Sequence, residues 1–243
     1  MRLAIALLFC AACSNEGRTP ATTAPAKKHD AALAPAPGPS PPPNDGAVVE
    51  PKPPPSGDTL VDIESLDDTI GLDIRYATEN NFTRVAVYPL ARCLLRYDVA
   101  IRLVKVQAAL VQGAGYGLKV WDCYRPISVQ QKFWALVPDS RYVARPVIEN
   151  GKPIKGSKHN RGAAVDLTLV DAAGKEVEMP TDYDDFSHKA HRDHAGATDA
   201  ARRHRQILED AMKQQGFEPL PTEWWHFDGP NWKSYPLSDE PLE

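Results

Sequence analysis

The sequence has few cysteines, no excess of basic residues and no long hydrophobic run. Its 243 residues include 28 Lys and Arg against 32 Asp and Glu, which gives a net charge of −4. Nucleic-acid-binding domains normally carry a basic patch, so this balance argues against a nucleic-acid partner. No apolar run reaches the roughly 18 residues that a membrane span requires. The HExxH motif is also absent, which excludes the commonest helix of zinc proteases.

Proline is the residue in excess. The chain has 23 prolines, where average usage would give about 12. Most of the surplus lies between Asn15 and Ser56, a stretch with almost no large apolar residues. Such a stretch cannot bury enough surface to offset its conformational entropy. We therefore expect residues 13–58 to be a disordered polyproline spacer, and residues 59–243 to form a domain long enough for one buried core.

The N-terminus has the pattern of an export signal. Arg2 precedes an apolar run over residues 3–12 that is too short to span a bilayer. Two alanines then precede Cys13, which resembles the cleavage box of bacterial lipoproteins, where the cysteine becomes the lipidated N-terminus. An ordinary signal peptide cut nearby is the alternative. Both predict export to the periplasm or cell envelope after removal of residues 1–12, and the first predicts membrane attachment by the lipid alone.

Four cysteines are present, and two of them are left for the domain. Cleavage removes Cys10 and acylation uses Cys13, so Cys93 and Cys123 remain. A disulfide between them is permitted in an oxidising compartment. Packing of the first predicted helix on the strand that follows it would bring the two together. Two unrelated buried thiols are the alternative.

The pattern of apolar residues predicts an α+β fold, in which helices pack on a small, mainly antiparallel sheet. The elements alternate in type and are separated by glycine and proline. The expected strands are residues 59–63, 71–76, 117–122, 163–170 and 224–228, and the expected helices are residues 91–112 ended by Gly113, a short helix capped by Ser128, and residues 198–215 ended by Gly216.

The segment SKHNRGAAVDLTLV contains the first candidate metal ligands. His159 and Asp166 stand on either side of Gly162 and two alanines. Apolar residues alternate along the strand that ends the segment, so Asp166 points away from the apolar face. A histidine in a flexible turn and a carboxylate on the polar face are candidate ligands, although this spacing also arises by chance.

The segment PTEWWHFD supplies the rest of a hydrolytic zinc site. Such sites use imidazole or carboxylate ligands, an open position for water and a carboxylate base. His226 can be a ligand and Glu223 the base, because neighbouring tryptophans would keep the carboxylate basic. An aromatic core strand with a satisfied histidine is the alternative. Since residues three apart in a strand face opposite ways, we expect Glu223 to precede the strand in irregular chain.

Arg125 is the third candidate, in the segment VWDCYRPIS. It follows a buried strand and precedes Pro126, which would hold it in a turn. A fixed guanidinium can stabilise an oxyanion. Pairing with Asp122 for structural reasons alone is the alternative.

Three histidines recur at every third position in a very polar stretch: His188, His191 and His194. This spacing is compatible with a second metal site. The polarity of the stretch favours a solvated loop or helix face instead.

Taken together, the motifs SxHxxGxAxD, EWWH and WDxYRP resemble the signatures of D-alanyl-D-alanine dipeptidases of the vancomycin-resistance type. These enzymes belong to a zinc peptidase superfamily that includes D-Ala-D-Ala carboxypeptidases and the zinc domain of hedgehog proteins. DIRYATENNF, MPTDYDDFSH and GFEPLPTEWWHF match in the same order. The resemblance therefore extends over most of the domain.

The resemblance implies one zinc ion per chain, bound in a cleft of this α+β fold, and a role for each candidate residue. By position, His159, Asp166 and His226 correspond to the zinc ligands. Glu223 corresponds to the general base and acid, and Arg125 to the group that stabilises the oxyanion.

The resemblance also implies a subsite for the free ammonium of a small dipeptide substrate. Asp184 corresponds to the carboxylate that receives the ammonium, and Tyr76 and Ser157 to residues that help to hold it. Asp182 and Asp185 are alternatives to Asp184, because all three lie in one acidic cluster.

The activity implied is hydrolysis of D-alanyl-D-alanine to two D-alanines in cell-wall metabolism. The alternatives are an exported D,D-carboxypeptidase that acts on longer peptides and a non-catalytic peptidoglycan-binding lipoprotein. The complete set of chemical residues disfavours the second alternative, and Asp184 with Tyr76 disfavours the first. A resistance enzyme must destroy the dipeptide in the cytoplasm, so export suggests scavenging of released dipeptide. The sequence leaves the oligomeric state open.

Overall fold

The computed structural model of the protein describes residues 54–242. The expected export signal, the expected lipidation site at Cys13 and the spacer up to residue 53 lie outside the described residues. Between residues 54 and 242 no helix has the length and apolarity needed to cross a bilayer. The backbone carbonyl of Gly57 accepts a hydrogen bond from the N–H of Asp98 at 3.2 Å. Structured contacts therefore begin slightly before residue 59.

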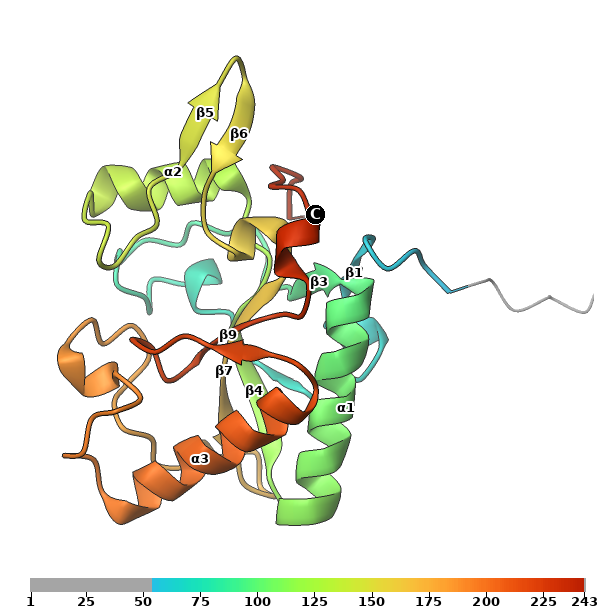
Figure 1. The fold of residues 1–243 in the computed structure, drawn as a ribbon, viewed down its shortest axis with the longest axis vertical. Coiled ribbons are helices and arrows are strands. Elements are labelled where there is room, and N and C mark those ends of the chain that lie inside the picture. The colour runs from blue at the N-terminus through green and yellow to red at the C-terminus, as the bar shows by residue number, and fades with distance from the viewer. Residues whose placement is uncertain (1–53, 243) are drawn as a thin grey trace, which may run out of the picture. The chain divides into compact units, whose positions relative to one another are not determined.

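A five-stranded sheet forms the centre of the domain, with strand order β2–β4–β7–β9–β8 (Figure 1). Only the β2–β4 pair is parallel. The predicted α+β class with a mainly antiparallel sheet is confirmed. The strands of this sheet are β2 Gly71–Leu72, β4 Gly117–Asp122, β7 Ala164–Val170, β8 Glu218–Pro219 and β9 His226–Asp228.

Within the part of the chain that the structure describes, three α-helices accompany the sheet. Helix α1 (Tyr97–Ala114) contacts β4, helix α3 (Asp199–Gln214) contacts β7 and β8, and the two helices contact each other. Helix α2 (Ile127–Leu136) lies near the two-stranded hairpin of β5 (Val147–Glu149) and β6 (Lys152–Lys155), at the top of Figure 1. Short 3₁₀ helices connect these elements: Ile63–Ser65, Arg75–Ala77, His159–Arg161, His188–Ala190 and Trp232–Ser234.

The first long helix begins later than predicted. Residues Leu94–Arg96 fit helical spacing, but they form strand β3, which pairs with β1 (Leu60–Asp62). The helix also runs past Gly113 and ends at Gly115, whose φ of 70° suits a left-handed C-terminal cap. The prediction failed because pairing with a distant strand overrides local periodicity.

The short helix α2 is not capped by Ser128, as the sequence predicted. Its N-cap is Pro126, and its first N–H groups find partners in the C-terminal segment. The N–H of Ile127 donates to the carbonyl of Ser238 at 3.1 Å, and that of Ser128 donates to the carboxylate of Asp239 at 2.8 Å. A cap that comes from so far along the chain leaves no local signal.

Cys93 and Cys123 form a disulfide, with their Cα atoms 5.2 Å apart. Both residues are buried. The bond joins the chain just before β3 to the chain just after β4, and so fixes the start of the turn that carries Arg125.

Replacing Cys93 and Cys123 together with alanine should lower the free energy of unfolding by roughly 3 kcal/mol, because the bond closes a loop of about 30 residues in the unfolded chain. Chemical denaturation of the two proteins measures the difference. Mass spectrometry that finds both thiols free in the oxidised protein would contradict the bond itself.

Candidate functional site

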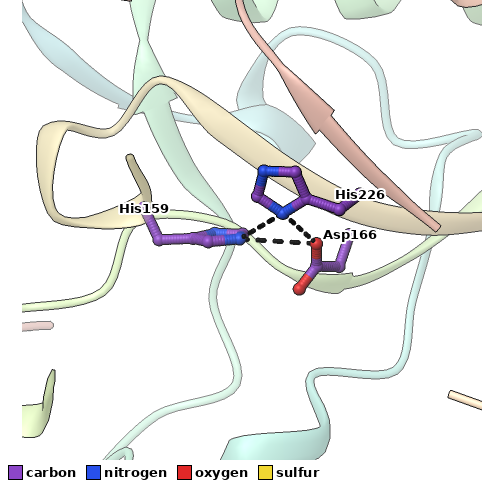
Figure 2. A group of neighbouring side chains, drawn as sticks. All are labelled: His159, Asp166 and His226. Carbon is purple, nitrogen blue, oxygen red and sulfur yellow. Dashed lines mark hydrogen bonds and ion pairs between the residues drawn. The ribbon is translucent and has the colours of Figure 1, made fainter. Parts of the chain in front are cut away.

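Two histidines and one aspartate meet in the interior of the domain (Figure 2). The Nδ1 atom of His226 lies 2.9 Å from Oδ1 of Asp166. The Nε2 atom of His159 lies 3.1 Å from Nδ1 of His226 and 3.4 Å from Oδ1 of Asp166. Each residue is at most 5% exposed. Among the described residues 54–242, these three form the one group of His, Cys, Asp or Glu side chains whose ligand atoms converge closely enough to hold a metal ion.

The sheet register explains why these side chains meet. Asp122 of β4 is paired with Asp166 of β7, and Asp166 is paired with His226 of β9. Residues directly opposite one another in antiparallel strands project from the same face. The register of β4 against β7 shifts between Val120 and Asp122, which is an irregularity of the kind that re-aims side chains near active sites. The result is a row of polar side chains across three strands.

Each member of the histidine and aspartate group has a partner on its outer side. His159 donates from Nδ1 to the carbonyl of Cys123 at 2.7 Å. His226 directs Nε2 to Asp228 at 2.9 Å. Tyr183 donates its hydroxyl to Oδ2 of Asp166 at 2.9 Å. Such partners fix the tautomer and orientation of metal ligands.

The atoms left facing one another fit a zinc ion. They are two imidazole nitrogens and one carboxylate oxygen, a donor set that zinc accepts together with one open position. The group also attracts a proton. Burial opposes protonation of His226, but hydrogen bonds to Asp166 and Asp228 outweigh it and raise its pKa to about 10. Although burial opposes ionisation of Asp166, the two histidines hold its pKa well below the usual value.

Glu223 lies beside the group, in irregular chain just before β9, where the sequence predicted it. Its Oε2 atom is 4.0 Å from Nδ1 of His226. Burial raises the pKa of the Glu223 carboxyl, while His226 opposes the rise. A raised pKa makes a carboxylate a better proton acceptor.

Arg125 forms the structural pair with Asp122 that the sequence offered as one alternative, and its oxyanion role stays a prediction. One terminal nitrogen contacts the carboxylate of Asp122 at 2.5 Å, and the other donates to Gln130 at 2.8 Å. The guanidinium also lies over the ring of Phe133, at 4.7 Å from its centroid. Despite this structural pairing, Arg125 lines the same cavity as the histidines, a space of about 320 Å³.

Asp184 lies on the wall of this cavity, and Asp182 and Asp185 do not. The hydroxyl of Tyr76 donates to the Asp184 carboxylate at 3.2 Å. Burial and the nearby Asp166 raise the pKa of Asp184 well above its usual value. Tyr76 and Ser157 line the cavity as well. The three residues proposed for the ammonium subsite are therefore brought together.

Several contacts of the site were missed at the level of sequence. Asp228 could have been found, because it stands two residues after His226 in a strand and so shares its face. The contact of Tyr183 with Asp166 could not be found from the sequence, because it depends on an unusual backbone angle at Asp184.

Within residues 54–242, the ligand atoms of the three histidines of the polar stretch do not converge as those of His159, Asp166 and His226 do. Their rings are neighbours, with centroids 4.9 Å apart for His188 and His194 and 5.9 Å apart for His188 and His191. His188 is exposed and the other two are partly exposed.

Comparison with known proteins identifies clear relatives. Residues 57–240 match the family model described as D-ala-D-ala dipeptidase. The chain is 36% identical over 178 residues to the D-alanyl-D-alanine dipeptidase of Escherichia coli (strain K12), which covers 73% of this chain and 88% of the relative. It is 33% identical over 183 residues to the D-alanyl-D-alanine dipeptidase of Enterococcus faecium, with 70% and 86% covered. The enzyme of the same name from Enterococcus faecalis is 36% identical over 186 residues, with the same coverage.

The pKa of His226 predicts how zinc affinity depends on pH. Because the pKa of His226 is about 10, its ring carries a proton at lower pH, and a metal ion must displace that proton to bind. The apparent zinc affinity should therefore rise roughly tenfold per pH unit between about pH 6.5 and pH 8.5. Competition with a chromophoric chelator, corrected for the chelator's own protonation, measures this slope. An affinity that stays constant over the range would contradict it.

Proposed function

The chain belongs to the D-Ala-D-Ala dipeptidase family, and from this premise we propose that it hydrolyses D-alanyl-D-alanine to two D-alanines with one zinc ion. His159, Asp166 and His226 are the proposed ligands. Glu223 is the proposed base and acid.

One observation carries this proposal: a single cavity has the His159, Asp166 and His226 group on one side and the partly buried carboxylate of Asp184 on the other. The ligand set and Asp184 both line this space of about 320 Å³, together with Arg125. A small molecule with a reactive carbonyl and a free ammonium matches both ends at once. D-alanyl-D-alanine is such a molecule.

The chemistry divides among few groups. A zinc ion held here would supply a Lewis acid and lower the pKa of a water molecule toward about 7. Glu223 takes the proton of the attacking water and returns it to the leaving amine. Its raised pKa supports both steps. Arg125, fixed by Asp122 and Gln130, stabilises the negative charge that develops on the substrate carbonyl oxygen.

Asp184 selects the substrate by charge. Its carboxyl is mostly withdrawn from water, and its raised pKa reflects the cost of ionising it alone. A substrate ammonium offsets that cost and forms a charge-assisted hydrogen bond. A longer peptide or an acylated dipeptide brings no ammonium to this point and leaves the carboxyl unpaired. The site therefore favours the free dipeptide over cell-wall precursors that contain the same two residues.

Export and lipidation at Cys13 complete the proposal, with the dipeptidase domain tethered to the envelope by the proline-rich spacer. The buried disulfide supports an oxidising compartment. In that location the enzyme acts on dipeptide released from the wall, which fits recycling of D-alanine.

The replacement Glu223→Gln should leave one zinc per chain and lower kcat roughly 10²- to 10⁴-fold, because it removes a base and keeps the ligands. Elemental analysis and kinetics on D-Ala-D-Ala measure the two effects. As a control, His226→Ala should lose the metal and the activity together. A metal-free wild type that is fully active would refute the zinc proposal, and a fully active Glu223→Gln would refute the role of the base.

N-acetylation of D-Ala-D-Ala should lower kcat/KM of the wild type by at least about 10²-fold. Loss of one partner of a buried charge pair costs about 3–5 kcal/mol, and each 1.4 kcal/mol is about tenfold. The replacement Asp184→Asn should lower kcat/KM on the free dipeptide by a similar factor. The ratio of kcat/KM between the free and the acetylated dipeptide should therefore fall. Product analysis by chromatography with both substrates gives these ratios.

The matched control is Asp182→Asn, because Asp182 belongs to the same acidic cluster but is exposed and lies outside the cavity. It should preserve the preference for the free dipeptide. Equal cleavage of both substrates by the wild type would favour a carboxypeptidase. Loss of the preference in Asp182→Asn alone would move the subsite to that residue.

A further inference from the structure

Tyr183 contacts the group of His159, Asp166 and His226 on its outer side and has no role in the reaction described above. Its hydroxyl donates to Oδ2 of Asp166 at 2.9 Å. The other oxygen, Oδ1, is the one that faces His159 and His226. The bond therefore holds the carboxylate in the orientation that presents a single oxygen to the centre of the site.

The backbone next to Tyr183 is unusual. Asp184 has a φ of 60°, in the left-handed region that non-glycine residues seldom adopt. In extended chain, consecutive side chains point in opposite directions. Here the left-handed angle turns the chain, so that Tyr183 reaches Asp166 while Asp184, the next residue, lines the cavity. Such angles persist where the surrounding structure holds them, and they concentrate at functional sites.

The ring of Tyr183 packs against two tryptophans. Its ring centroid lies 4.8 Å from that of Trp121 and 5.5 Å from that of Trp225. Its hydroxyl is also 3.3 Å from the hydroxyl of Tyr76, which in turn donates to Asp184 at 3.2 Å. Hydroxyl contacts thus run from the carboxylate of the metal-type site to the carboxylate of the ammonium subsite.

We propose that Tyr183 is a positioning residue that orients Asp166 for zinc, and that the Tyr183–Asp184 peptide joins the zinc site to the ammonium subsite as one rigid unit. The unit sets which bond is cut, because it fixes the ammonium of the substrate at a constant separation from the metal. This inference rests on the proposed zinc-dependent function and adds to it a residue outside the ligand set.

The test compares zinc affinities by chelator competition at a fixed pH. Tyr183→Phe removes only the hydroxyl and keeps the packed ring, so it should bind zinc about 10- to 100-fold more weakly than the wild type. Tyr142→Phe is the matched control. Tyr142 lines the same cavity, but its ring packs on Phe186 at 4.8 Å, so the zinc affinity should stay at the wild-type value.

A kinetic readout separates positioning from a general packing defect. Because Tyr183→Phe weakens the metal site and removes no reacting group, added zinc should restore most of its activity on D-Ala-D-Ala. Added zinc should not restore Glu223→Gln. A Tyr183→Phe protein with wild-type zinc affinity would overturn the role of the hydroxyl.

Two variants of Asp184 test whether the Tyr183–Asp184 peptide links the zinc site to the ammonium subsite. Asp184→Asn and Asp184→Val both remove the charge, but asparagine tolerates the left-handed angle and valine does not. Asp184→Val should bind zinc more weakly than Asp184→Asn. Equal affinities would overturn the rigid link. A wild type that binds no zinc would instead refute the proposed function, so the two failures are distinguishable.

Discussion

The arrangement depends on the burial of two imidazoles and a carboxylate that face one another across strands β7 and β9 and the turn that precedes β7. Buried polar groups are costly unless each is hydrogen-bonded. The fold meets this demand on the outer side of the group, through the carbonyl of Cys123, the hydroxyl of Tyr183 and the carboxylate of Asp228. On the inner side the three ligand atoms face one another, and a proton on His226 lets its Nδ1 bond Oδ1 of Asp166 at 2.9 Å. A metal ion at this point would take the place of that proton.

The same constraint links elements that are far apart in the chain. The carbonyl that orients His159 belongs to Cys123, whose side chain is bonded to Cys93. Two residues later, Arg125 donates its backbone N–H to the carbonyl of His159 at 3.1 Å. The disulfide, His159 and Arg125 are therefore all attached to one short turn after β4. Movement of this turn would shift both the candidate metal site and the guanidinium that lines the cavity.

The sequence predicted those elements whose signals are local. Strand β4 was predicted to the residue, and helix α3 (Asp199–Gln214) lies within the predicted range 198–215. The predictions failed where distant chain decides the outcome, as in the pairing of Leu94–Arg96 with β1. The β5–β6 hairpin was not predicted, because its strands are short and mostly exposed.

The candidate site was predicted from the order of its motifs rather than from any one of them. Spacing alone could not show that Asp166 and His226 lie opposite one another, since cross-strand register is a property of the folded sheet. Nor could it choose Asp184 from its acidic neighbours. That choice depends on a left-handed backbone angle at Asp184 and on its contact with Tyr76. Neither can be predicted from the residues next to Asp184 in the sequence.

The central claim is that one zinc ion is held by these three residues, and anomalous diffraction at the zinc edge tests it most directly. A crystal of the zinc-loaded protein should show one strong peak within about 2.0–2.3 Å of Nε2 of His159, Oδ1 of Asp166 and Nδ1 of His226. A fourth position should be open to water or substrate. A peak elsewhere, for example among His188, His191 and His194, with none between His159 and His226, would contradict the account.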